Sequence, residues 1–210
     1  MTAKRKLWLI SALLYLVFFS WYTDFRPPLS DQEIDSWKAS RLADNADPAA
    51  ISRAEQAFRN DSGGQLLMIN LIDYNENPGL VKGAQAGESA EDLMMRYMQH
   101  MLPAMLARGS HPVLVGDTVA DVFDWMGIEG AEHWDSGSVF RYRSRRTLFD
   151  IVSNPAFVGE VHFKHAAISK TIAIPVAPQL FLGDLRLILG LLMLAVTALL
   201  DALVFAKRNT

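Results

Sequence analysis

Two histidines are the first side chains in this sequence whose types and spacing could do chemistry together. At an i, i+3 spacing, His162 and His165 would lie on one face of a helix, where both imidazoles could bind one metal ion. No matched spacing places a third ligand beside them, although His100, His133 and Glu160 are conceivable. We therefore expect a structural or surface pair, with no metal site and no cofactor.

Polar and aromatic side chains elsewhere form a candidate ligand-binding pocket. Asn70 is a polar residue within an apolar run, so it is either a buried amide bonded to a neighbouring loop or a group that orients a ligand. Trp134 comes just before a predicted strand that carries Arg141 and Tyr142. Together with His165 these residues make up the candidate pocket. The sequence assigns no catalytic residue.

A basic cluster interrupts an otherwise acidic stretch of the chain. Residues 24–179 contain 14 Lys and Arg against 21 Asp and Glu, a net charge of −7. Within this stretch Arg143, Arg145 and Arg146 follow Arg141 closely. They either neutralise the surrounding carboxylates or contact an anionic ligand, lipid head groups or an acidic partner. The acidic balance argues against nucleic acid as a partner, because such a domain repels phosphates.

Two apolar runs, residues 7–22 and 185–206, are predicted to cross a membrane, one near each end of the sequence. A helix needs about 20 apolar residues to span the hydrocarbon core. The first run lacks a small-x-small cleavage site, which favours an uncleaved signal-anchor formed by residues 1–25 over a cleaved signal peptide. Asp201 lies in the second run and is expected to pair with Arg5 or Lys6, or to contact a partner.

The cations that flank both runs predict how the chain is oriented. Lys4, Arg5 and Lys6 precede the first run, and Lys207 and Arg208 follow the second. Short flanks rich in Lys and Arg stay in the cytoplasm. We therefore expect a bacterial inner-membrane protein with cytoplasmic termini and a periplasmic central domain. The chain has no cysteine, so disulfides and thiolate catalysis are excluded.

The central region is predicted to contain a helical segment followed by an α+β domain. In residues 26–64, Ser30 and Glu33 form a capping-box pattern, and the segment either lifts the domain off the bilayer or packs on its side. Residues 65–178 alternate between segments with the apolar periodicity of a strand and segments with that of a helix, and residues 180–208 contain the second span. The expected strands are 65–74, 112–117, 138–143 and 171–176, with a further extended piece at 119–126, and the expected helices are 88–108, 144–152 and one beginning near 154. This order predicts a ferredoxin-like βαββαβ fold.

Several short motifs within residues 65–176 also resemble a known superfamily. They are Met68-Ile69-Asn70-Leu71, Tyr97 with Pro103 and Gly109, Trp134-Asp135, Arg141-Tyr142-Arg143-Ser144, and Asn154-Pro155-Ala156-Phe157 followed by His165-Ala166-Ala167. On these residues the domain resembles the dimeric α/β-barrel superfamily, and within it a small uncharacterised bacterial branch. The resemblance implies a homodimer whose two sheets face each other, and relatedness to antibiotic-biosynthesis and haem-degrading monooxygenases.

Three functions follow from these patterns. The first is a non-enzymatic accessory or assembly subunit of an inner-membrane complex, which docks on other membrane-protein subunits through its periplasmic domain. The second, implied by the resemblance, is a cofactor-free or haem-linked monooxygenase that uses Asn70, Trp134, Arg141, Tyr142 and His165. The third is a sensor of a small ligand at the membrane surface. The sequence favours the first, because it contains no phosphate-binding loop and no recognised catalytic motif.

Overall fold

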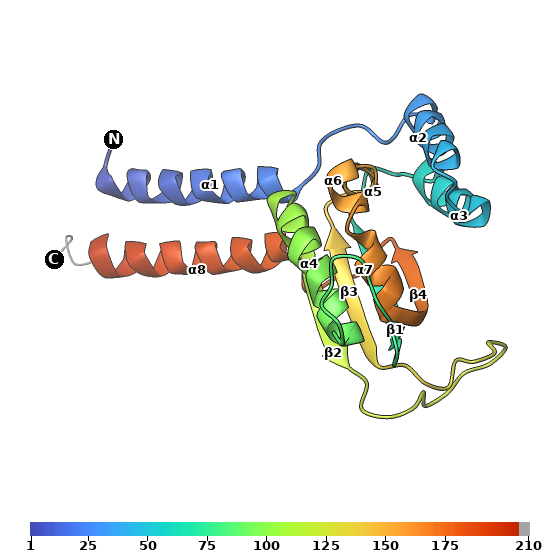
Figure 1. Cartoon of the computed structure of the whole chain (residues 1–210). Helices are drawn as coiled ribbons and strands as arrows, with labels where there is room; N and C mark the ends of the chain where they lie inside the picture. The colour runs from blue at the N-terminus through green and yellow to red at the C-terminus, as the bar shows by residue number, and fades with distance from the viewer. Residues whose placement is uncertain (206–210) are drawn as a thin grey trace. The chain divides into compact units, whose positions relative to one another are not determined.

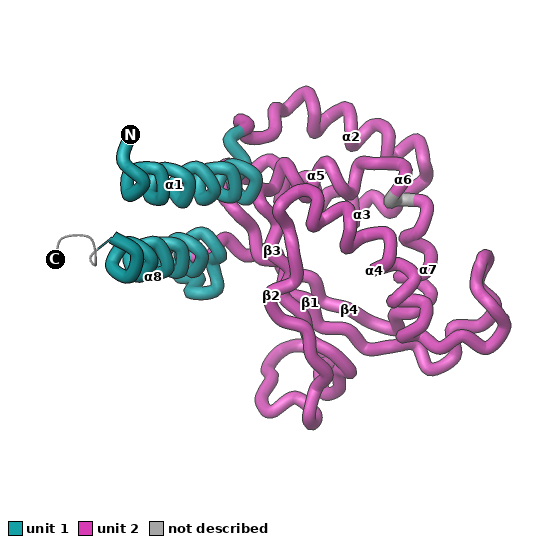
Figure 2. Tube along the Cα trace, turned by 90° about the vertical axis from the view of Figure 1, so that its left-hand side faces the viewer, with its two compact units in different colours: residues 1–25, 179–210 teal, residues 26–178 magenta. Residues whose placement is uncertain are grey.

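The computed structural model describes residues 1–205, except for the side chains of Phe157 and Val158. These residues form two compact units, one from residues 26–178 and one from both ends of the chain (Figure 2). The predicted basic pair Lys207 and Arg208 lies outside the described residues.

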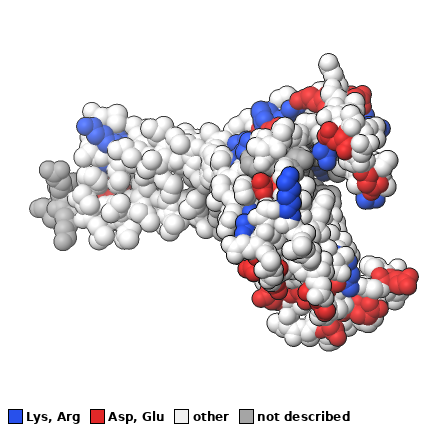
Figure 3. Space-filling model, in the orientation of Figure 1, with Lys and Arg blue, Asp and Glu red and all other residues white. Residues whose placement is uncertain are grey.

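The unit formed by the chain ends is a pair of antiparallel helices, α1 (Ala3–Tyr22) and α8 (Leu185–Phe205). The helices lie side by side, so that the start of α1 is next to the end of α8 (Figure 1). Their outward-facing side chains are apolar and exposed, for example Leu13 and Leu191. In Figure 3 the surface of the pair is almost without charge between its ends.

Several polar side chains of the two helices contact one another and form what we call the polar seam. Asp201 accepts a hydrogen bond from Trp8 Nε1 at 3.2 Å and lies 2.9 Å from Lys4 Nζ. One turn further along α1, the hydroxyls of Ser11 and Thr197 are 2.8 Å apart. The sequence predicted Arg5 or Lys6 as the partner of Asp201, whereas the structure places Lys4 there. A pair that is polar inside and apolar outside is the reverse of a water-soluble helix pair.

By length and composition, one of the described helices is apolar enough to cross a membrane, namely α8. The sequence predicted two such spans. The difference arises at α1, whose first turns contain Lys4, Arg5 and Lys6 and therefore lower the hydropathy of a helix only 20 residues long.

The other unit contains a four-stranded antiparallel sheet and six helices among its described residues. In chain order these are α2 (Asp31–Ala43), α3 (Pro48–Arg59), β1 (Leu66–Tyr74), α4 (Ala90–Ala107), β2 (His111–Asp117), β3 (Ser136–Tyr142), α5 (Arg145–Val152), α6 (Pro155–Val158), α7 (Val161–Ala167) and β4 (Ile168–Val176). The strand order is β2-β3-β1-β4, and every neighbouring pair is antiparallel. A βαββαβ chain with this order has the ferredoxin-like topology. The predicted fold class is confirmed at this level.

Helices α4, α5 and α7 cover one face of the sheet (Figure 1). The core between the layers contains Leu66, Met101, Met105, Tyr142 and Ile151, all buried. Met98, Met101 and Met105 of α4 therefore lie on the face of the helix that packs against the sheet. Helix α4 begins at a capping box, where the Ser89 hydroxyl accepts a hydrogen bond from the Asp92 backbone N–H.

Helices α2 and α3 pack on the side of this domain, which is one of the two alternatives that the sequence left open. Trp37 and Phe149 both contact Phe58, in each case with nearly perpendicular rings whose centroids are 5.3 and 5.2 Å apart. Arg59 of α3 ties the two helices together through ion pairs with Asp31 and Asp35 of α2. These aromatic contacts remove apolar surface of the helix pair and of α5 from water, and this stabilises the packing.

Two elements differ from the prediction. Residues 119–126 are not a strand but part of a loop between β2 and β3, which is closed by backbone hydrogen bonds from Thr118 to Asp135 and from Val122 to Glu132. The helix predicted to begin near residue 154 is divided into α6 and α7 around Gly159. Glycine raises the free energy of a continuous helix by about 1 kcal/mol relative to alanine, which weakens the helix at this point.

The pairing of α1 with α8 predicts that cysteines at the polar seam will form a disulfide. The natural chain has no cysteine, so Ser11→Cys together with Thr197→Cys introduces a single thiol pair. We expect this double variant to oxidise within one chain, seen as a shift in gel mobility that reducing agent reverses. Ser11→Cys with Val196→Cys is the matched control, because Val196 is exposed on α8. Equal crosslinking in both variants would contradict the pairing.

Candidate functional site

The structure does not bring the five predicted pocket residues together. The Asn70 amide donates a hydrogen bond to the backbone oxygen of Met68 at 3.2 Å, on the helix-covered side of β1. Trp134 is buried in the β2–β3 loop, where its indole N–H donates to the Ala131 carbonyl at 3.0 Å. Both contacts are local and satisfy polar groups within the fold.

Arg141 and Tyr142 are buried residues of β3. Arg141 is fully buried and donates hydrogen bonds to the Gln65 side chain and to the backbone oxygen of Gly109, each at 2.7 Å. Tyr142 belongs to the core between sheet and helices, and its burial raises the pKa of the phenol. A guanidinium held in this way fixes the end of the sheet, because a buried cation requires satisfied donors.

The histidine pair lies on α7, but its members have different surroundings. Both ring nitrogens of His162 are within hydrogen-bond distance of backbone oxygens, at 2.8 Å from Gly159 and 3.0 Å from Lys82. That ring has no nitrogen left for a metal ion. His165 is only partly shielded from solvent. The pKa of His165 is lowered by this partial loss of hydration and by the neighbouring Lys164 and His162.

A different set of potential ligands meets at the β2–β3 loop. Ligand atoms of Asp73, His133 and Asp135 lie within 4.8 Å of one another. His133 is also 3.0 Å from Asp121, and these two aspartates, Asp121 and Asp135, raise its pKa. The ammonium of Lys170 lies 4.0 Å from Asp73 and supplies the positive charge that the group would otherwise take from an ion. The sequence indicated His133 as a conceivable third ligand for the histidines of α7, and it gave no sign that Asp73 of β1 would lie beside it.

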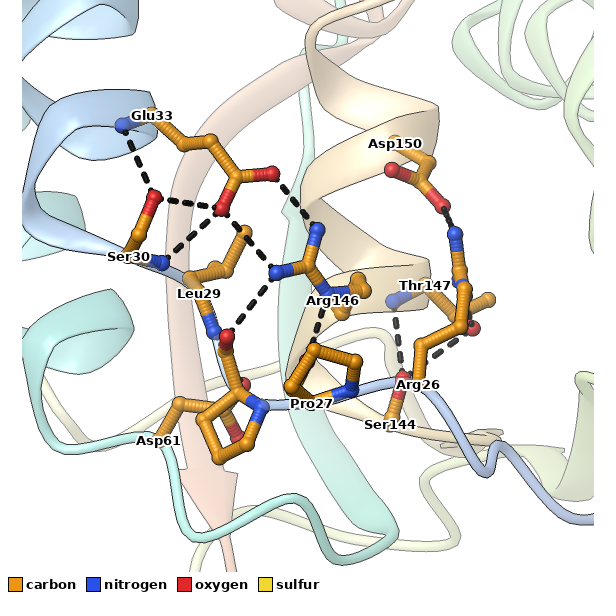
Figure 4. Close-up of polar contacts among 11 residues, drawn as sticks. Arg26, Pro27, Leu29, Ser30, Glu33, Asp61, Ser144, Arg146, Thr147 and Asp150 are labelled. Carbon is orange, nitrogen blue, oxygen red and sulfur yellow. Dashed lines mark hydrogen bonds and ion pairs between the residues drawn. The ribbon is translucent and has the colours of Figure 1, made fainter.

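The predicted lipid- or partner-contact arginines largely make contacts inside the domain. Arg146 donates to both carboxylate oxygens of Glu33, at 2.6 and 3.0 Å, and to the carbonyls of Pro27 and Pro28, at 2.7 and 2.8 Å (Figure 4). Arg145 donates to the Asn60 carbonyl, and Arg143 to the Thr147 hydroxyl at 3.4 Å. We call the contacts of Arg146 the α5 clamp.

The α5 clamp fixes the segment that precedes α2. Arg26 extends it by pairing with Asp150 on α5 at 2.8 Å (Figure 4). Hydrogen bonds from Arg146 and from Ser30 lower the pKa of Glu33 to about 2. The sequence predicts the Ser30–Glu33 capping box. No local pattern connects Glu33 with Arg146, which is 113 residues away in the chain.

A cavity of about 700 Å³, which we call the α3 cavity, opens between the α2–α3 pair and the rest of the domain. Of the predicted pocket residues, His165 lines it, together with the predicted contact residue Arg145. The remaining walls come from elements that the sequence did not connect: α3, α5, the helix-covered side of β1 and the edge strand β4. No local sequence signal identifies such a cavity, because segments distant in the chain form it.

The second face of the sheet carries apolar side chains that no helix of residues 26–178 covers, and we call it the open face. Register places Ile69 beside Val139 and Ile174, and Val139 beside Leu114. Ile69, Leu114 and Ile174 are 37%, 59% and 49% exposed. A row of exposed aliphatic side chains over three or more strands is typical of an interaction surface.

Comparisons with known proteins bear on the fold. No protein-family model and no curated protein matches this chain. It is similar to the crystal structure of RPA0582, a protein of unknown function from Rhodopseudomonas palustris, with 18% identity over 65% of this chain and 96% of that one and a TM-score of 0.51. The methylated RPA0582 protein gives 19% identity, coverage of 66% and 96%, and a TM-score of 0.52.

A third likeness is weaker. A dimeric protein of unknown function and ferredoxin-like fold from Bacteroides fragilis is 10% identical over 55% of this chain and 97% of that one, with a TM-score of 0.33. A score this low says nothing about the oligomeric state of the present chain. The RPA0582 structures share this fold, and they assign no activity to it. The relation to monooxygenases therefore stays a prediction.

The α5 clamp predicts an unusually acidic Glu33. Its contribution to stability is complete above the unfolded pKa of about 4.5 and is lost as pH falls toward the folded value of about 2. Because 41% of the side chain is exposed, solvent screening limits this contribution to roughly 1 kcal/mol. Arg146→Ala should return the pKa of Glu33 toward 4.5, as measured by NMR of the carboxyl carbon. Arg53→Ala is the control and should leave the pKa of Glu33 unchanged. A pKa near 4.5 for Glu33 in the natural protein would refute the clamp.

Proposed function

We propose that this protein is a membrane-anchored, non-enzymatic subunit that docks through its ferredoxin-like domain in an inner-membrane complex. The open face is the observation that carries the proposal. Its aliphatic side chains are exposed within the domain, although the opposite face of the same strands is packed under helices. Exposed apolar area of this kind is stabilised when a partner removes it from water.

Anchoring in the membrane is supported by the helix pair. By composition α8 can cross a bilayer. The polar seam joins it to α1 through Asp201, Thr197 and their partners, and the outward surface of both helices is apolar. In lipid, polar groups of a span need partners within the protein, and α1 supplies them. We therefore propose α1 as the second span.

The proposed orientation follows from charge. Lys4, Arg5 and Lys6 at the start of α1 favour the cytoplasmic side. Since α1 and α8 are antiparallel, the end of α8 lies on that side as well, and the acidic domain between them lies in the periplasm. This placement is consistent with a protein that has no cysteine and so has no disulfide to form there.

The occupant that we propose for the open face is a second copy of the chain. Two such faces, both apolar, would form a closed sandwich of two four-stranded sheets, in the way that the superfamily resemblance implies. A different membrane-protein subunit is the alternative occupant. Either of them removes Ile69, Leu114 and Ile174 from water.

The monooxygenase alternative receives less support from the geometry. A reaction would require several of its five candidate residues at one cavity, whereas of these His165 alone lines the α3 cavity. Arg141 and Trp134 have their polar groups bonded within the fold. The ligand-sensor alternative is supported by the α3 cavity, whose volume suits a small molecule.

The docking proposal predicts that a charge on the open face will separate the subunits. Leu114→Glu places a carboxylate among its aliphatic side chains and should weaken self-association at least about tenfold, equivalent to about 1.4 kcal/mol. Val115→Glu is the matched control, because Val115 is the next residue of β2, points to the opposite face and is 69% exposed. Mass measurement by light scattering in mild detergent gives the oligomeric state. If the natural protein is monomeric and carries no other subunit, the docking proposal fails.

The topology proposal is tested with single cysteines. Leu80→Cys, in the exposed loop before α4, should react with a membrane-impermeant thiol reagent in intact cells with a permeabilised outer membrane. Thr2→Cys should react after the inner membrane is lysed. The chain has no natural cysteine, so each signal has one source. Labelling of Thr2→Cys in intact cells would overturn the orientation.

A further inference from the structure

The α3 cavity lies on the helix-covered side of the sheet, on the opposite side of the strands from the open face. Its inner wall contains Leu66 and Met68 of β1, and Ala173 and Pro175 of β4 close one edge. At about 700 Å³ its volume is in the range of pockets that bind small molecules, which is roughly 300–1,000 Å³. The cavity therefore has room for a ligand larger than a few waters.

Small residues on α3 create this space. Ala50, Ala54 and Ala57 recur at i, i+4 and i+7, so they lie on one face of the helix, and all three line the cavity. Larger apolar side chains on the same helix, Ile51 and Phe58, are buried and hold it against the domain. The helix is thus anchored at its packing contacts but leaves a gap beside them.

The walls of the cavity are suited to an apolar chain. Besides the alanines they include Met101 of α4 and Leu148 and Ile151 of α5. Trp37 also lines the cavity, and its indole Nε1 is buried without a hydrogen-bond acceptor among the described residues. A buried donor without a partner is costly, and a ligand or a trapped water would satisfy it.

Cations gather at this cavity in a domain that is acidic elsewhere. Arg41, Arg53 and Arg145 line it together with one carboxylate, Asp47. Arg41 pairs with Asp44 at 3.5 Å, and Arg53 pairs with the lining carboxylate of Asp47 at 3.8 Å. Arg145 contacts the Asn60 carbonyl, and no carboxylate pairs with it within the described part of the chain. The wall is therefore net positive.

We propose that the α3 cavity binds an amphipathic anion, with its apolar chain between α3 and the sheet and its carboxylate or phosphate on Arg145. Apolar walls select the chain by removing it from water, and the guanidinium groups select the head group. A cationic amphiphile of the same length is repelled, and a neutral one gains no ion pair. The inference does not rest on the docking proposal, because it concerns the other side of the sheet.

The test uses the full-length protein in lipid nanodiscs, which avoids detergents that would compete for the cavity. The probe is a fluorescent polyene fatty acid, displaced by palmitate, hexadecyl phosphate, hexadecanol or hexadecylamine, with empty nanodiscs as the blank. We expect palmitate or hexadecyl phosphate to displace the probe at least tenfold more effectively than the alcohol or the amine. The two anions distinguish a carboxylate site from a phosphate site.

Two variants assign the binding to this cavity. Ala54→Trp fills the space and should abolish saturable binding, whereas Arg145→Gln removes the head-group partner and should weaken binding of the anions about tenfold without changing that of hexadecanol. Arg143→Gln is the matched control, because Arg143 is two residues away and does not line the cavity. Circular dichroism checks that each variant is folded. If Ala54→Trp does not fold, Arg145→Gln still tests the proposal.

Three results would overturn the proposal. They are binding no greater than to empty nanodiscs, equal displacement by hexadecanol and palmitate, and unchanged affinity in Arg145→Gln. The oligomeric state of Leu114→Glu reports on the docking proposal separately, so either inference can fail while the other stands.

Discussion

The structure depends on one constraint: β1 is apolar on both of its faces, and the helices of its domain cover one of them. Leu66 and Met68 pack under α4 and α5, and this packing forms the core of the domain. Leu67, Ile69 and Leu71 point the other way, because successive side chains of a strand alternate between faces. A central strand of this composition needs cover on both sides. The domain supplies half of that cover, and a partner on the open face would supply the rest.

The second notable arrangement is the wall that α2 and α3 add to the ferredoxin-like core. They are held by the aromatic contacts of Phe58 with Trp37 and Phe149, and by the α5 clamp at the start of α2. Neither contact seals the gap that the alanines of α3 leave. Rigid attachment beside an unfilled space is what a preformed binding site requires, since the protein then loses little entropy when a ligand enters.

Local signals in the sequence were enough to place most elements. The predicted capping box of Ser30 and Glu33 is formed at the start of α2. Ser89 and Asp92 form a second capping box at the start of α4, and Gly109 has a positive φ just after that helix ends. Strand β1 and helix α4 were predictable because their periodic patterns are long. The break at Gly159 was missed because the apolar spacing continues across it.

The candidate site was much less predictable, for a physical reason. The sequence left open whether Arg146 neutralises a carboxylate or contacts a partner, and it could not identify Glu33, which is 113 residues away in the chain. Arg141 and Trp134 have residue types that suit a pocket, but their donors are satisfied by Gly109 and Ala131. Burial and pairing depend on tertiary contacts, which composition and spacing do not encode. The α3 cavity was invisible for the same reason.

The two edge strands of the sheet limit how copies of this protein can associate. Pro112 lies in β2 and Pro175 in β4, and a proline has no backbone N–H with which to bond another strand. Growth of the sheet from chain to chain is therefore discouraged at both edges, and with it the open-ended assembly that leads to fibres. Two copies that associate through their open faces, by contrast, bury the exposed apolar surface of both, and no further copy can then add there. The two edge strands thus favour a finite assembly over an open-ended one.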